Sequence, residues 1–162
     1  TQRQEGYSRK FRLGSVYTPQ MVVNGQAEFV GVDEGRARKE IAKAAKQPIG
    51  RVALTVDHDV VGIHAAGLPP EAKGADVILA VTETRLDTDV QRGENNGRNL
   101  RHTGVVRRLE TVGRMDDAKS GSYAGQVRLR LDPSWKRENL KLVVLLQDRA
   151  TKRIWSAGTV GL

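Results

Sequence analysis

The strongest constraint on the fold lies in residues 16–31, where an Asn-Gly pair separates two short apolar segments. Residues 21–23 form an apolar run, and residues 27–30 resume it after Asn24-Gly25. Because Asn and Gly both tolerate positive φ, this dipeptide between apolar segments is a strong signal for a tight hairpin. The stretch predicts two antiparallel strands joined at Asn24-Gly25.

The flanking residues predict what precedes and follows this hairpin. Pro19 lacks a backbone donor and biases Thr18 toward extended geometry, so it marks the entry to the first strand. Upstream, residues 2–13 carry Tyr7 and Phe11 at helical spacing and are expected to form a short amphipathic helix. Downstream, Asp33 is placed to cap a helix over residues 34–46. The predicted order is helix, Thr-Pro turn, hairpin, helix.

From residue 51 onward the apolar residues no longer recur at helical spacing but at every second position, which is typical of strands. The sequence Asp57-His58-Asp59 predicts a turn between the first two strands, and residues 77–81 predict a strand covered on both faces. Residues 85–99 are polar and are expected to form a long surface loop. Further strands are expected at 102–114, 127–131, 142–146 and 154–160. In the strand at 102–114, one side is expected to carry Val105, Arg107 and Leu109, and the other side Val106, Arg108 and Glu110. About six or seven short strands separated by turns indicate an antiparallel β-sandwich.

The fold class is therefore expected to be α+β, with a domain boundary at Pro48-Ile49-Gly50. Residues 1–48 form the first predicted domain and residues 51–162 the second, β-sandwich-like one. The chain opens at Thr1 on a polar, helix-like segment with no strand before it. This beginning favours a processed chain, a fragment or a truncated form.

The absence of cysteine excludes a disulfide, a thiol nucleophile and a cysteine-ligated metal within these 162 residues. No run of about 20 apolar residues occurs, so the sequence predicts no membrane-spanning helix. No signal peptide is present either, although an earlier removal of one stays open.

The net charge of +8 raises the possibility of a nucleic-acid partner. The basic residues are nevertheless scattered along the chain, and several alternate with apolar residues as on a solvated strand face. Stacking aromatics and a known nucleic-acid motif are both missing. A basic but solvated surface is the preferred interpretation. If the protein instead bound nucleic acid, its affinity for DNA or RNA should fall steeply with salt concentration.

Two stretches resemble a known family. VYTPQMVVNG at residues 16–25, followed by AEFVG, looks like the cis-proline loop and following strands of a thioredoxin-like domain. Together with GENNGRNLRHTGVVR at residues 93–107, it resembles bacterial secreted proteins of domain-of-unknown-function family 1223. The resemblance implies the C-terminal part of a thioredoxin-like domain followed by the β-sandwich, and a periplasmic or secreted location. The family's upstream Cys-x-x-Cys element is lacking here.

The first candidate site is the predicted substrate-binding loop Tyr17, Thr18 and Pro19. In a thioredoxin-like fold this loop offers backbone groups to an extended substrate, and the resemblance implies a cis bond at Pro19. An ordinary turn proline is the alternative.

The second candidate is a ligand loop formed by Glu94, Asn95, Arg98 and His102. A carboxylate, a guanidinium and an imidazole on one loop can bind a small anion or a peptide end. The simpler interpretation, which we prefer, is that Glu94 and Arg98 pair to order the loop and His102 begins a strand.

A third cluster, Asp57, His58, Asp59 and His64, has side chains that suit zinc. The first three are well explained as a turn, so no metal or other cofactor is predicted. No catalytic residue is predicted either, since no nucleophile triad, phosphate loop or dinucleotide fingerprint is present.

The leading functional hypothesis is a thioredoxin-like envelope protein that exchanges thiols and disulfides, or assists redox-linked folding, when a cysteine-bearing segment is present. Its partners would be a peptide or protein thiol substrate, together with that N-terminal segment or a companion chain. The alternative is a non-catalytic module that binds a peptide, a protein or an anion. By itself the chain is not expected to be an oxidoreductase.

Overall fold

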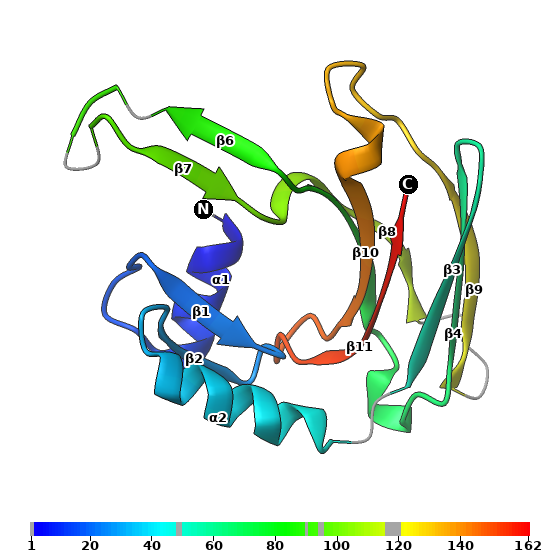
Figure 1. Cartoon of the computed structure of the whole chain (residues 1–162). Coiled ribbons are helices and arrows are strands. Elements are labelled where there is room, and N and C mark those ends of the chain that lie inside the picture. Colours follow the sequence, from blue (N-terminus) through cyan, green and yellow to red (C-terminus); the bar gives the residue numbers. More distant parts are fainter. Residues whose placement is uncertain (1, 48–49, 90, 94–95, 116–120) are drawn as a thin grey trace.

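The computed structural model describes residues 2–47, 50–89, 91–93, 96–115 and 121–162. It is an α+β structure with two α-helices and antiparallel sheets (Figure 1). The predicted domain boundary includes residues 48 and 49, which lie outside the described residues, and the division at this point stays a prediction. Within the described part, no helix combines the length and apolar character needed to cross a membrane.

The N-terminal part has the predicted order of elements. Helix α1 (Gln2–Phe11) precedes the hairpin of β1 (Gln20–Val23) and β2 (Ala27–Val30), and α2 (Glu34–Ala45) follows. Asn24 and Gly25 have φ values of 47° and 65°, which confirms the reason for expecting a turn there. Asp33 caps α2, since its carboxylate accepts a hydrogen bond of 2.9 Å from the backbone N–H of Arg36.

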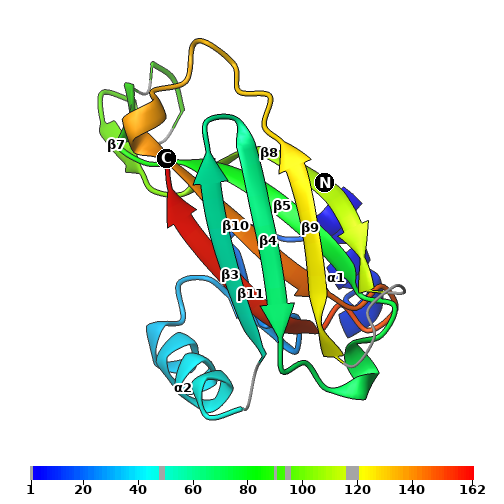
Figure 2. The same cartoon turned by 90° about the vertical axis from the view of Figure 1, so that its right-hand side faces the viewer.

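The C-terminal part contains two antiparallel sheets that pack on each other (Figure 2). The larger sheet has the strand order β11-β10-β5-β8, and the smaller one has the order β3-β4-β9. The apolar core between them is almost wholly aliphatic. The strands of these sheets are β3 (Arg51–Asp57), β4 (Val60–Ala66), β5 (Asp76–Glu83), β8 (Val105–Arg114), β9 (Tyr123–Arg128), β10 (Leu140–Gln147) and β11 (Ile154–Gly161). Short 3-10 helices span Pro70–Ala72 and Arg137–Asn139.

Strand β5 is central to the larger sheet and is buried on both faces, as its uninterrupted apolar run predicts. Val77, Leu79 and Val81 point into the core between the sheets. Ile78 and Ala80, on the opposite face, are also buried. Part of that second face borders a cavity shared with α1, because Ile78 and Tyr7 are both among its lining residues.

The expectation of a long loop over residues 85–99 is wrong for residues 86–89 and 99, which are strand, whereas the exposed residues 91–93 and 96–98 lie outside strands as expected. Strands β6 (Leu86–Asp89) and β7 (Asn99–His102) form a separate antiparallel ribbon that extends from β5 and β8 (Figure 1). The Asn99 amide donates to Asp89 over 2.8 Å, and a His102 ring nitrogen lies 3.1 Å from the Thr88 hydroxyl. Both strands are mostly exposed. A ribbon without a buried face has no apolar alternation, so its sequence looked like a loop.

The expected alternation along β8 is also wrong. The pairing of β5 with β8 shifts register between Val81 and Thr82, where Thr82 pairs with Val106 and Val81 with Arg108. Arg107 is the extra residue of this bulge. Its Nε atom donates to a carboxylate oxygen of Glu83, at 2.7 Å, and Glu83 is only 2% exposed. The buried carboxylate therefore has a cationic partner because the ladder is irregular.

The hairpin turn packs tightly against the sandwich. The carbonyl of Asn24 accepts a hydrogen bond of 2.9 Å from the N–H of Ile154. A Cβ atom added to Gly25 would lie 1.8 Å from the carbonyl oxygen of Lys152, which precedes β11. Gly25 is therefore required both for its positive φ and for the close approach of two backbones.

We expect Gly25→Ala to destabilise the protein by about 2 kcal/mol or more, since the left-handed conformation and the backbone clash both oppose a side chain. Urea unfolding measures this loss. Gly14→Ala is the matched control, because a Cβ at Gly14 meets no atom within 4 Å and should change stability little. Equal stability of the two variants would contradict the packing described for the turn.

Candidate functional site

The predicted loop Tyr17, Thr18 and Pro19 lies where α1 and the hairpin meet. The hydroxyl of Tyr17 donates a hydrogen bond to the carboxylate of Glu28 on β2. The same carboxylate oxygen accepts from the side-chain amide of Gln20, at 3.1 Å. These contacts hold Tyr17 against the hairpin and leave Thr18 and Pro19 exposed.

The backbone of this loop is fixed at both ends. The amide of Gln4 on α1 donates to the carbonyl of Tyr17 over 2.7 Å. The Thr18–Pro19 peptide bond is cis. The carbonyl of Pro19 accepts a hydrogen bond of 2.8 Å from the N–H of Gly31. This last bond is the first rung of the hairpin.

The rung between Pro19 and Gly31 determines which backbone groups of β1 point away from β2. In an antiparallel pair, residues that exchange hydrogen bonds alternate with residues that do not. With the observed register, Met21 and Val23 face β2, whereas the N–H and C=O groups of Gln20 and Val22 point outward. Among the described residues no third strand pairs with this edge. The exposed loop therefore continues directly into an open strand edge.

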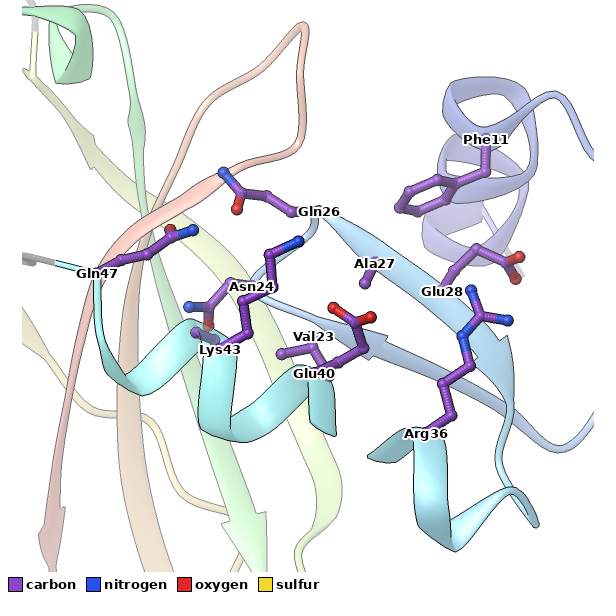
Figure 3. A pocket seen from close by; sticks show the side chains of 11 residues that line it. Phe11, Val23, Asn24, Gln26, Ala27, Glu28, Arg36, Glu40, Lys43 and Gln47 are labelled. Carbon is purple, nitrogen blue, oxygen red and sulfur yellow. The ribbon is translucent and has the colours of Figure 1, made fainter. Parts of the chain in front are cut away.

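Beside the hairpin lies a cavity of about 340 Å³ (Figure 3). Its walls come from the hairpin, from α2 and from Phe11 of α1. In Figure 3 the guanidinium of Arg36 points toward the carboxylate of Glu28, and Glu40 points toward Ala27. The lining is mainly polar and carries charges of both signs: Asn24, Gln26, Glu28, Arg36, Glu40, Lys43 and Gln47. A lining of this kind suits a polar ligand with several hydrogen-bonding groups.

Helix α2 covers this cavity without becoming buried itself. None of its residues is buried, and Ile41 is 54% exposed. Arg36 stacks over the ring of Phe29, with its Cζ atom 5.1 Å from the ring centroid. Val30 and Val32, next to the helix, are also exposed.

The second predicted site, the ligand loop, is described only at Arg98 and His102. Glu94 and Asn95 lie outside the described residues. Arg98 is exposed just before β7, and His102 contacts Thr88 within the β6–β7 ribbon. Among the described residues no hydrogen bond links His102 or Arg98 with the loop at Tyr17.

The acidic and histidine residues at the β3–β4 turn do not converge either. A ring nitrogen of His58 lies 2.8 Å from a carboxylate oxygen of Asp57, and Asp59 pairs with Arg128 at 3.4 Å. His64 is exposed on β4, opposite Ala53. The described ranges contain no group of three or more side chains placed to hold a metal ion.

Sequence reasoning missed the residues that hold the Tyr17 loop, namely Gln4, Gln20 and Glu28. The only signal for Glu28 was a charged side chain in the middle of an apolar strand. Its partner could not be identified, because the contact depends on how the segment before β1 folds back on β2.

The hydrogen bond to Glu28 raises the pKa of Tyr17, and burial and the negative charge of Glu28 act in the same direction. The folded state thus favours the neutral phenol. The neutral phenol of Tyr17 therefore stabilises the folded state at every pH below the ordinary tyrosine pKa of about 10. This stabilisation is lost as the pH rises through the raised pKa of Tyr17 in the folded state.

We expect Glu28→Gln to lower the pKa of Tyr17, because the charge and the strong acceptor are both removed. Ultraviolet titration of the phenol groups measures the change, and Tyr17→Phe assigns the transition. Tyr123, whose pKa burial raises, is the internal control and should not shift. An unchanged Tyr17 transition would show that Glu28 is not its partner in solution.

Comparisons with known proteins place this structure within a family. No curated protein matches the chain. A crystal structure of a protein from Agrobacterium tumefaciens is similar, with a TM-score of 0.69 and 23% identity, over 98% of this chain and 68% of that chain. At this identity the likeness concerns the fold alone. A family model described as "Protein of unknown function (DUF1223)" matches residues 1–147, and the chain therefore belongs to this family.

Proposed function

We propose that the open edge of β1 binds an extended peptide segment and that the loop of Tyr17, Thr18 and Pro19 positions this segment. The observation that carries the proposal is the outward direction of the backbone groups of Gln20 and Val22. An extended chain paired with these groups gains main-chain hydrogen bonds, which is how sheet edges bind peptides. Because the loop immediately precedes β1, such a chain would run beside Thr18 and Pro19.

The chemistry proposed for this unit is thiol–disulfide exchange or redox-linked folding in a thioredoxin-like protein of the periplasm or secreted space. It requires a cysteine pair from outside these residues, because residues 1–162 contain none and a thiolate is the attacking group. In this division of roles, the present residues bind the peptide or protein thiol substrate, and a cysteine-bearing segment or companion chain reacts with it. The location agrees with the compartments in which disulfides persist.

A non-catalytic binding module is the second candidate, and the polar cavity beside the hairpin favours it. In that case the protein holds a peptide, a protein or an anion without changing it covalently. The two candidates share the binding surface and differ only in the cysteine pair. Nucleic acid is a less suitable partner, because several arginines are already paired with carboxylates, including Arg38, Arg101, Arg107, Arg128 and Arg149.

Peptide binding at the β1 edge is tested with Val22→Pro, which removes an outward N–H and keeps the bonds to β2. We expect it to weaken binding of a fluorescent peptide of alternating valine and threonine about tenfold or more. Val22→Ala is the matched control, since it trims the same side chain and keeps the N–H, and should bind within about threefold of the parent protein. Equal loss in both variants would contradict pairing through the backbone.

The redox role is tested with protein isolated from its natural source. We expect its intact mass to exceed 17.8 kDa and its sequence to include two close cysteines. That form should reduce a disulfide substrate in the presence of a recycling dithiol, whereas residues 1–162 alone should give only the uncatalysed rate. A source protein without cysteine would overturn the redox role and leave the binding module.

A further inference from the structure

A second cavity lies between α1 and the larger sheet, away from the hairpin edge. Its volume is about 240 Å³. Arg3, Tyr7 and Arg9 of α1 form one wall, and Ile78 of β5, Leu109 of β8 and Gln147 of β10 contribute to the other. The volume is below the range of about 300–1,000 Å³ that is common for drug-sized ligands. The cavity therefore suits a ligand about as large as a single amino-acid residue.

The hydroxyl of Tyr7 has an unused hydrogen-bond donor at this cavity. Its oxygen accepts two bonds, from a terminal nitrogen of Arg3 at 3.1 Å and from the side-chain nitrogen of Gln147 at 3.0 Å. The orientation of the Gln147 amide is fixed, because the same nitrogen also donates to the carbonyl of Lys152 at 2.7 Å. Neither partner can accept the phenol proton, and the described residues supply no other acceptor for it.

The phenol group with this unused proton is buried and is bonded to a residue distant in sequence. Tyr7 is 8% exposed and Gln147 is 4% exposed. Their contact joins residues 140 positions apart in sequence. Buried polar groups normally use their donors. A hydrogen-bond acceptor bound in the cavity would accept the unused proton of the Tyr7 hydroxyl.

The charges around the cavity favour an anionic acceptor. Four cationic side chains line it, against the two carboxylates of Asp76 and Asp148. Asp76 already pairs with Arg149 over 2.6 Å, and one oxygen of Asp148 accepts from the hydroxyl of Thr151 over 2.8 Å. Within the described part of the chain, no carboxylate pairs with Arg9. A ligand carboxylate would therefore meet positive charge that is not yet compensated.

The wall opposite α1 carries two apolar side chains among its polar ones, Ile78 and Leu109. Ile78 is buried, whereas Leu109 is 42% exposed although it lies on the sheet face next to α1. An aliphatic side chain of the ligand would cover Leu109 and remove apolar surface from water.

We propose that this cavity binds a carboxylate that carries a short aliphatic side chain, with the Tyr7 hydroxyl donating to the carboxylate and Arg3 and Arg9 compensating its charge. Two sources share this chemistry, namely the C-terminal residue of a peptide and a small free aliphatic acid. The site uses neither the β1 edge nor the Tyr17 loop, so it stands apart from the proposed function.

The test is a calorimetric or NMR titration of the whole chain with N-acetylleucine. We expect binding at least tenfold tighter than that of N-acetylleucinamide, which has the same shape without the charge. Isocaproate distinguishes the sources, because a site for peptide ends should prefer N-acetylleucine and a site for free acids should prefer isocaproate. Equal binding of acid and amide, or binding of neither acid, would overturn the proposal.

Two variants assign the binding to this cavity. Tyr7→Phe should weaken N-acetylleucine binding about tenfold, whereas Tyr123→Phe, which removes a phenol elsewhere, should not. Because Tyr7→Phe also removes the acceptor of Arg3 and one of the two acceptors of Gln147, a second test is needed. Arg9→Gln on the exposed helix surface provides it and should weaken binding severalfold. Arg12→Gln is its control. Unchanged affinity in Arg9→Gln would place the ligand elsewhere, and neither result bears on peptide binding at β1.

Discussion

The contact between the Asn24-Gly25 turn and the chain entering β11 determines how the two parts of the molecule are arranged. One backbone hydrogen bond joins Asn24 to Ile154, and the close approach of Gly25 to Lys152 leaves no room for a side chain. The buried pair Tyr7 and Gln147 adds a second connection. Both cavities depend on these contacts, since α1 contributes to the wall of each.

The two parts of the chain achieve order in different ways. The sandwich has a continuous aliphatic core between its sheets, with β5 buried on both faces. The N-terminal part has little core of its own: α2 contains no buried residue, and Phe29 is the buried side chain of the hairpin. Its order relies on polar contacts such as Tyr17 with Glu28 and on its attachment to the sandwich. An open strand edge and exposed apolar residues remain, which is typical of a surface that meets another chain segment.

Local signals predicted the elements whose cause lies in a few neighbouring residues. Asn24-Gly25 predicted the hairpin, Asp33 predicted the start of α2, and the apolar run at 77–81 predicted a doubly covered strand. The β6–β7 ribbon was missed because exposed strands have no apolar period. Of the candidate site, sequence predicted Tyr17, Thr18 and Pro19 but not Glu28, whose role depends on a contact across the hairpin.

The sequence by itself determined the α+β class, the order helix, hairpin, helix in the N-terminal part, and the absence of a thiol in these residues. These features follow from the spacing of apolar residues, from the residue types at turns and from composition, all of which can be read along the chain without knowing its tertiary contacts. Only the tertiary structure decided that Arg107 meets Glu83 at a bulge, that Gln147 meets Tyr7, and which backbone groups of β1 point outward. These features depend on strand register and on contacts between distant residues, and local side-chain preferences do not specify either.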